Sequence, residues 1–515
     1  MTIRAMLRHA AKATLLALTL LPRAEVLSQA SQTKKITVPK MWDDAAMEKL
    51  EVPLANPIGS PKQAPADYYY RIPVRPIYKQ YLVYAPGREP AGYMAWLKQQ
   101  EPVIVWDGSN KPKLATDADW IRAGEIVFSA GGTPSDQGFI TMADVQSAAW
   151  YEHGIPVTKD GVLPFVHYVI REKGKVELGA FSCAMCHTRV MPNGTILKGA
   201  QGNFPFERAA KYSSLAHMPA PTLFTLNRLL YAIPWLDPDP LDREKNMTTD
   251  EVMEVLQTIP PGVISRHRAS HFTPVQVPDL IGVKDRHYLD RTGLQPQHSI
   301  VDLMRYGALN QGGDFISSFD GFIPADVPDF KKLPDPSDPV RMSGRYSDEQ
   351  LFAVALYIYS LKPPPNPNKF DASAARGKKI FAGEGCTKCH TPPLYTNNKL
   401  TPAEGFKVPA DHPAKYEILP RSVGTDPDLT LKTRRGTGYY KVPSLKGVWY
   451  RSMFGHSGWC ATLEDWFDPN RENDDYVPTG FIPYGKKTYA VKGHPFGLDL
   501  TPQEKKDLIA FLKTL

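Results

Sequence analysis

The chain has 515 residues, 42% of them hydrophobic and 22% charged, which is ordinary for soluble globular proteins, and this length predicts two or three domains. The formal net charge is +7, but residues 1–30 contribute +3 of it, and no long run of Lys or Arg follows. Nucleic acid is therefore not expected as a partner.

Residues 1–30 have the pattern of an export signal. A basic start precedes a short apolar run at 13–21, and Ser28 and Ala30 occupy the small-residue positions of a cleavage site. The alternative is a membrane anchor, but the run is about half of the roughly 20 residues that a bilayer span needs. We predict no stable membrane insertion, and a mature protein in the periplasm or outside the cell.

Four of the five cysteines lie in two C-x-x-C-H motifs, at 183–187 and 386–390. Two C-x-x-C pairs in an exported protein are also compatible with disulfide loops or with one zinc site. The histidine after each second cysteine favours covalent c-type haem, because two thiols add to the vinyl groups of one haem and the next residue reaches the iron. The sequence therefore predicts two covalently bound haems.

Each motif supplies the attachment residues and one iron ligand. Cys183 and Cys186 are predicted to hold haem 1, with His187 on its iron. The second motif is predicted to hold haem 2 through Cys386 and Cys389, with His390 on its iron. The fifth cysteine, at position 460, is expected to be a buried free thiol.

Similar helices are predicted around both motifs. Residues 372–390 predict a helix and a glycine-rich turn into the second motif, and 119–132 resembles this stretch. Capped amphipathic helices are predicted at 346–364 and 500–515, the latter with Thr501 as its N-cap. The predicted fold class is mainly α, with two cytochrome c-like domains in tandem, each with one covalent haem, and long loops.

The predicted domain boundaries follow composition and the proline-rich stretch near residue 365. The segments are a signal peptide (1–30), an extended wrapping segment (31–115), domain 1 (116–362, with an insertion at 133–180), a linker (363–370) and domain 2 (371–515).

A second repeat lies downstream of each motif. Residues 277–293 align without gaps on 442–458, and seven of the 17 positions are identical. We interpret the two copies as one structural element that passes the far face of each haem, the alternative being a shared loop remote from the iron. In this alignment Arg291 of domain 1 stands where domain 2 has His456.

This difference predicts unlike irons. His456 is predicted to be the second ligand of haem 2, with Met453 as the alternative. Arginine does not bind iron, so haem 1 is predicted to be open to peroxide or dioxygen, with Arg291 as a catalytic residue that stabilises the bound oxygen species. Two alternatives remain: Arg291 pairs with a haem propionate, or His287 closes haem 1.

The two motifs, the stretch KVPSLKGVWYRSMFGHSGWCATLEDWFDP (441–469) and the closing LTPQEKKDLIAFLKTL (500–515) resemble the bacterial di-haem cytochrome c peroxidase superfamily. That superfamily includes the enzyme that matures tryptophan tryptophylquinone and the di-haem rubber oxygenases, and the wide motif spacing is more similar to the latter. Where the peroxidases carry a methionine ligand, this chain has Asn470.

The resemblance implies an oxidoreductase in which one haem exchanges electrons and the other meets peroxide or dioxygen. A donor or acceptor protein and a small-molecule oxidant or substrate are the expected partners. Calcium is possible, as in some relatives, but no sequence feature supports it. The alternative functions are a pure electron-transfer cytochrome with two six-coordinate haems, and an accessory subunit of a larger dehydrogenase.

Overall fold

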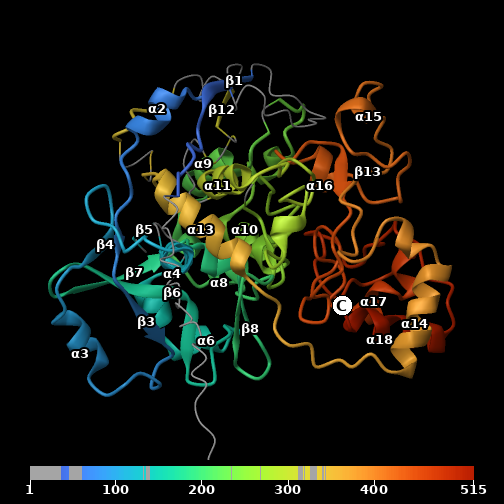
Figure 1. Ribbon diagram of the computed structural model, residues 1–515, viewed down its shortest axis with the longest axis horizontal. Coiled ribbons are helices and arrows are strands. Elements are labelled where there is room, and N and C mark those ends of the chain that lie inside the picture. Colours follow the sequence, from blue (N-terminus) through green and yellow to red (C-terminus); the bar gives the residue numbers. More distant parts are fainter. Residues whose placement is uncertain are drawn as a thin grey trace, which may run out of the picture. The chain divides into compact units, whose positions relative to one another are not determined.

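Two pairs of long helices frame the two C-x-x-C-H motifs (Figure 1). Helix α4 (Asp117–Ser129) packs against α13 (Asp348–Ser360), and α14 (Ala372–Gly383) packs against α18 (Pro502–Lys513). In each pair one helix precedes a motif in the chain, α14 directly and α4 by more than 50 residues, and its partner follows far downstream. Each motif therefore lies between two helices that contact each other.

The starts of these helices follow from local side-chain chemistry. The hydroxyl oxygen of Thr501 accepts a hydrogen bond from the backbone amide of Glu504, and the Glu504 carboxylate accepts one from the backbone amide of Thr501. This confirms the predicted cap of α18, and capping boxes also start α4 and α13. The predicted apolar face of α18 is confirmed as well, because Leu508, Ile509 and Leu512 are buried.

Each pair crosses where one helix carries a glycine. A Cβ atom on Gly124 would collide with the backbone carbonyl oxygen of Ala353, and one on Gly377 with that of Asp507. The absence of a side chain therefore allows the helix backbones to touch. Both helix pairs have a glycine at their crossing, so the two motifs have similar surroundings.

Asp507 ties α18 to α14. Its carboxylate accepts hydrogen bonds from Nε and Nη2 of Arg376, at 2.6 and 2.7 Å, and from Ser373 Oγ at 2.5 Å. These hydrogen bonds lower the pKa of Asp507 to about 2, and those from Arg376 have the largest effect. Because this pKa is lower in the folded state than its usual 3.8, the stabilisation is present above pH 4 and is lost as the pH falls from about 4 to about 2.

We therefore expect Asp507→Asn to lower the thermal midpoint at pH 7 and to weaken the dependence of that midpoint on pH between 4 and 2. Circular dichroism melts of the variant and the parent at several pH values measure this. A parallel pH dependence in both proteins would contradict the assignment.

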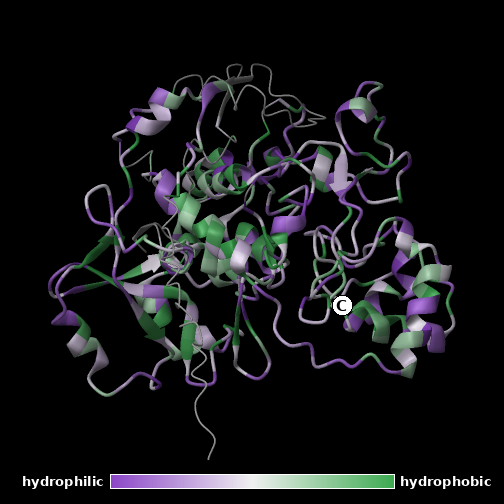
Figure 2. Cartoon of the chain, viewed as in Figure 1, coloured by the Kyte–Doolittle hydropathy of each residue, from purple (hydrophilic) through white to green (hydrophobic). Residues whose placement is uncertain are grey.

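A four-stranded antiparallel sheet lies beside the first helix pair. Its order is β3 (Gln80–Tyr84), β6 (Val162–Glu172), β7 (Lys175–Ala180) and β5 (Thr133–Pro134). Strand β6 is hydrophobic along most of its length (Figure 2), and its side chains are largely buried in a core with β3 and β7. The sequence analysis did not predict this sheet, so the fold is less dominated by helices than expected.

The sheet joins two segments that the sequence analysis treated separately. Strand β3 comes from 31–115, interpreted as an extended wrapping segment, and the other three strands come from the stretch 133–180, interpreted as an insertion. Both segments therefore contribute to one hydrophobic core.

The other described elements are short. The helices are α2 (Ala66–Arg71), α3 (Tyr93–Lys98), α5 (Met142–Val145), α6 (Ala148–Tyr151), α7 (Cys183–Cys186), α8 (Phe206–Ala210), α9 (Ala220–Tyr231), α10 (Thr249–Gln257), α11 (Ile300–Leu309), α15 (His412–Lys415), α16 (Asp428–Leu431) and α17 (Leu463–Trp466). The 3₁₀-helices are η2 (Ser214–His217), η3 (Pro240–Glu244), η4 (Val283–Asp285), η6 (Cys386–Lys388) and η7 (Pro469–Glu472). Paired strands are β1 (Pro61–Gln63) with β12 (Phe322–Pro324), β2 (Ile77–Tyr78) with β4 (Ile104–Trp106), β8 (Thr188–Val190) with β9 (Ile196–Lys198), β10 (Val263–Ile264) with β11 (Val275–Gln276), and β13 (Leu400–Pro402) with β14 (Tyr439–Lys441).

These elements come from a computed structural model, which describes residues 36–515 except 46–60, 132, 135–139, 234, 267, 311–316, 318, 320, 325–332, 339–341 and 343. The predicted export signal, residues 1–30, lies outside the described residues. Within the described part, no helix is both long enough and apolar enough to cross a bilayer.

The two copies of the downstream repeat have similar backbones and contact each other. Gly282 and Gly447, equivalent in the alignment, have φ angles of 72° and 74°. The amide of Lys441 donates to the carbonyl oxygen of Arg291 at 2.9 Å, and the Tyr450 hydroxyl donates to Asp279 Oδ2 at 2.7 Å. Residues from both halves of the chain therefore meet beside the second motif.

Candidate haem sites

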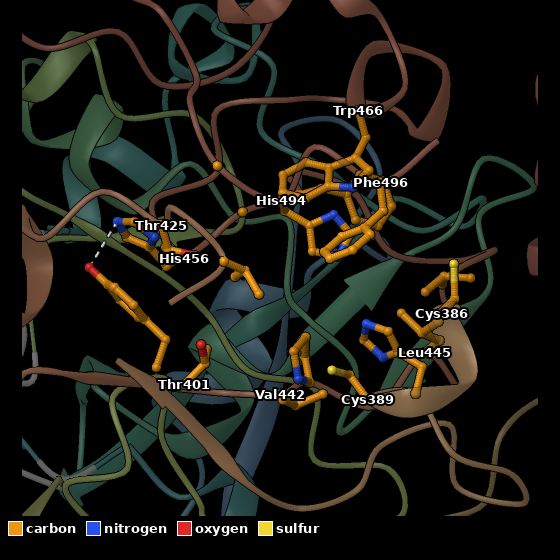
Figure 3. A pocket seen from close by; sticks show the side chains of 18 of the residues that line it. Cys386, Cys389, Thr401, Thr425, Val442, Leu445, His456, Trp466, His494 and Phe496 are labelled. Atoms are coloured by element: carbon orange, nitrogen blue, oxygen red, sulfur yellow. Dashed lines mark hydrogen bonds between the residues drawn. The ribbon is translucent and has the colours of Figure 1, made fainter. Parts of the chain in front are cut away.

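The second motif opens onto a cavity of about 220 Å³ (Figure 3). Cys386, Cys389 and His390 all line it. Much of the remaining wall is apolar and includes Phe381, Leu445, Trp459, Trp466, Phe467 and Leu508. Neither cysteine forms a disulfide, so both are free to form thioether bonds with the vinyl groups of a haem, and burial raises the pKa of Cys386 to about 11.

The imidazole of His390 is oriented by the backbone. Its Nδ1 lies 3.1 Å from the carbonyl oxygen of Tyr395, and the backbone of Pro443 also interacts with the ring. Burial lowers the pKa of His390, so the ring is neutral. With Nδ1 donating to a carbonyl group, Nε2 is left as the nitrogen that can bind iron.

The first motif is built in the same way. Helix α7 carries Cys183 and Cys186, and burial raises their pKa values to about 11 and about 12. Burial lowers the pKa of His187 to about 4, and a hydrogen bond to the backbone of Pro278 opposes this shift. Both cysteines are free of disulfides, and so is the buried Cys460, as predicted.

The repeat begins at the histidine of each motif. Pro278 interacts with His187 and its equivalent, Pro443, interacts with His390. The start of each copy therefore lies beside a motif histidine. That the rest of the element passes the far face of each haem remains a prediction, as does the alternative of a loop remote from the iron.

His456 lies in the cavity wall, across the pocket from Cys386 (Figure 3). Its ring stacks on Tyr440 with centroids 4.4 Å apart, and Nε2 lies 3.3 Å from the Tyr440 hydroxyl. Burial lowers the pKa of His456 to about 3. The other predicted ligand, Met453, is not among the described residues that line the cavity and packs in the core that includes Val263 and Trp459.

Arg291 lines the cavity of the second motif, together with Lys441 and Arg451. Burial, and then repulsion from Arg451 and Arg286, lowers the pKa of Arg291 to about 9. The Nε atoms of all three arginines are buried without a hydrogen-bond partner among the described residues. This basic cluster (Arg286, Arg291, Lys441 and Arg451) is placed to bind an anion.

The donor set and the charges fit haem. The nearby carboxylates are already engaged, since Asp279 accepts from Tyr450 and Asp290 pairs with Arg435 at 2.9 Å. Haem carries two propionates, which would supply the charge that the basic cluster lacks. Zinc has no such support, because no group of three or more His, Cys, Asp or Glu in the described chain is arranged to hold a metal ion.

His287 lies apart from both motifs. About half of its side chain is exposed, and its Nδ1 lies 2.6 Å from Glu417 Oε2. This surface pair gives no support to the alternative in which His287 binds haem 1.

A buried acid beside the first motif was missed by the sequence analysis. Glu207, on α8, interacts electrostatically with Cys186 and with Arg266. Its Oε1 accepts hydrogen bonds from the amide and hydroxyl of Ser265, at 2.6 and 3.0 Å, whereas Oε2 is buried without a hydrogen-bond partner among the described residues. Burial raises the pKa of Glu207. No sequence pattern marks this glutamate, because Ser265 and Arg266 approach it from a distant part of the chain.

His494 was also missed, although it lies in the cavity of the second motif. Its ring contacts Trp466 and Phe496, with centroids 5.4 and 5.2 Å away, and Figure 3 shows the three together. Burial lowers the pKa of His494 to about 3, so the ring is neutral. It is a single histidine in a loop rich in Gly and Pro, which no motif singles out.

No family model matches the chain. Two curated proteins do, both described as the cytochrome-c peroxidase IdrP1. The one from Pseudomonas sp. (strain SCT) is 26% identical over 217 residues, covering 38% of this chain and 54% of the relative. The one from Denitromonas iodatirespirans is 29% identical over 227 residues, covering 38% and 55%. The match therefore spans about half the length of these relatives.

Solved structures give weaker matches. Hydrazine synthase of Kuenenia stuttgartiensis has a TM-score of 0.27 and 18% identity, over 47% of this chain and 72% of that one. A MauG-like protein associated with microbial copper homeostasis has a TM-score of 0.28 and 19% identity, over 47% and 73%. TM-scores this low carry no argument about the present fold.

Proposed function

We propose that this chain, which is similar over part of its length to two bacterial proteins described as cytochrome-c peroxidases, is an exported c-type cytochrome that holds two haems covalently and acts as an oxidoreductase in the periplasm or outside the cell. The observation that carries the proposal is the pair of equivalent sites. At each one, two free cysteines precede a histidine whose ring interacts with the first proline of the repeat.

The tandem arrangement of two cytochrome c-like domains is part of this proposal. It is supported by the two helix pairs that cross at Gly124 and Gly377, and by the similar backbones of the two repeats. Domain boundaries near residues 116 and 363–370 remain predictions.

The two sites are proposed to differ in role. Bound haem supplies one-electron chemistry and, where a coordination position is open, binding of peroxide or dioxygen. Haem 2, in an apolar cavity with a second histidine in reach, is the proposed electron-transfer group. Haem 1 is the proposed reactive site, where Glu207 can accept or donate a proton through its unpaired Oε2. A catalytic role for Arg291 remains a prediction, and its place in the wall of the second cavity supports the alternative, a propionate partner.

Haem content tests the proposal directly. The protein is expressed with its leader in a host that matures c-type cytochromes, and the covalent haem per chain is measured by the pyridine haemochrome assay. We expect two haems in the parent, one in Cys183→Ala/Cys186→Ala, and one in Cys386→Ala/Cys389→Ala. A parent with no covalent haem would contradict the function outright.

Electron paramagnetic resonance of the oxidised parent separates the enzyme from a pure electron carrier. One high-spin and one low-spin haem are expected of the enzyme. Two low-spin haems that persist after partial reduction would favour the carrier. The expected partners are a redox protein and a small-molecule oxidant or substrate.

A further inference from the structure

Two histidines line the cavity of the second motif. His390 belongs to the motif, and His494 comes from the loop between η7 and α18. Their ring centroids are 6.3 Å apart.

This separation suits two ligands of one iron. Iron–imidazole bonds of about 2 Å on both sides of the metal, plus the radius of each ring, place the two ring centres about 6 Å apart. The stacked pairs His153–Tyr212 and His456–Tyr440 are closer, with centroids 3.6 and 4.4 Å apart, whereas unstacked ring contacts such as Phe204–Phe206 reach 6.4 Å. The space between His390 and His494 is therefore wider than a stacked contact.

The loop holds His494 in an unusual backbone conformation. Its φ angle is 49°, in the left-handed region that non-glycine residues rarely adopt. The amide of His494 donates to the carbonyl oxygen of Val423 at 2.6 Å, and the carbonyl oxygen of His494 accepts from Nη2 of Arg471 at 2.9 Å. Such strain persists where the surroundings impose it and is concentrated at functional sites.

Arg471 fixes this loop from inside the protein. It is fully buried and also donates to the carbonyl oxygens of Trp466, at 2.9 Å, and Val491. One guanidinium group thereby joins the end of α17 to the 491–494 stretch of the loop, which fixes the backbone of His494.

The two ligands predicted from the sequence are placed differently. His456 has its Nε2 beside the hydroxyl of Tyr440 and its ring against that of Tyr440, and Met453 is not among the described residues that line the cavity. We propose that His494, rather than His456 or Met453, is the second axial ligand of the iron of haem 2. This inference rests on the proposed function, since it requires haem at the second motif, and it makes haem 2 a six-coordinate group closed to oxidants.

The first test is His494→Gly. Glycine accepts the φ angle of 49° without strain and leaves room for a free imidazole beside the iron. We expect two haems per chain, as in the parent. In the electron paramagnetic resonance spectrum, the low-spin signal of one haem should be replaced by a high-spin signal. Added imidazole should restore the low-spin signal. His456→Gln and Met453→Leu are the matched controls and should keep it.

A second variant covers the case in which the glycine variant does not fold. His494→Met keeps a ligand at the same position, and methionine in place of histidine raises the reduction potential of a haem. We expect the potential of haem 2 to rise while both haems stay bound. Retention of the parental low-spin signal in His494→Gly, or an unchanged potential in His494→Met, would overturn the proposal. Absence of haem from the parent would instead contradict the proposed function.

Discussion

Replacing Gly377 by alanine is expected to lower the thermal midpoint of the haem-loaded protein by about 2–5 °C. The new Cβ would collide with the backbone carbonyl oxygen of Asp507 and lie 2.9 Å from Cβ of Phe511. Neither neighbour is the free end of a flexible side chain, so α14 and α18 must separate. Overpacking of this kind costs about 1–3 kcal/mol, which exceeds the gain of about 0.5–1 kcal/mol from alanine in a helix.

Gly383, at the end of the same helix, supplies the control. A Cβ atom there has no neighbour within 4 Å, so Gly383→Ala should leave the midpoint unchanged or raise it slightly. Calorimetry and loss of the Soret band measure the two variants. Equal midpoints for both would show that the helix crossing does not depend on the glycine.

The features that the sequence predicted correctly are local. The cap of α18 depends on Thr501 and Glu504, three residues apart, and its buried face repeats with the period of a helix. The two C-x-x-C-H motifs are equally local, since one short turn carries both cysteines and the histidine. Such patterns need no knowledge of distant contacts.

The features that were missed depend on contacts between distant segments. Strand β3 pairs with β6 about 80 residues later, and neither segment alone shows that partner. The alignment of the two repeats correctly indicated a similar backbone, as Gly282 and Gly447 show. The alignment did not indicate that Arg291 would line the cavity of the second motif. The two copies contact each other, so residues of the first copy lie beside that cavity as well.

His494 illustrates the same limit at the site itself. It follows His390 by 104 positions and has no fixed spacing to any motif. Only the folded chain brings it near His390, through the loop that Arg471 holds. The alignment favoured His456 because this residue stands inside a recognisable repeat, and a histidine outside every repeat was not considered.

Replacing Arg471 by methionine is expected to destabilise the second site and to release His494. The change removes charged donors to three backbone carbonyl groups, those of Trp466, Val491 and His494, in a fully buried position. Hydrogen bonds from charged groups contribute about 1.5–3 kcal/mol each, and the loss of such a network costs about 3–5 kcal/mol. We expect a lower thermal midpoint together with a partial low-spin to high-spin change at haem 2.

Two variants make this expectation specific. Arg122→Met removes an exposed arginine, whose side chain is 67% exposed and pairs with Asp119, and should change neither the midpoint nor the spin state. Arg471→Lys keeps the buried charge, but a lysine cannot donate to three carbonyl groups in the same plane. Its thermal midpoint and its high-spin fraction should lie between those of the parent and those of Arg471→Met. If Arg471→Met lowers the midpoint while haem 2 stays fully low-spin, Arg471 stabilises the fold without positioning His494. If the thermal midpoint falls and haem 2 becomes partly high-spin, Arg471 both stabilises the loop and positions His494 as the iron ligand.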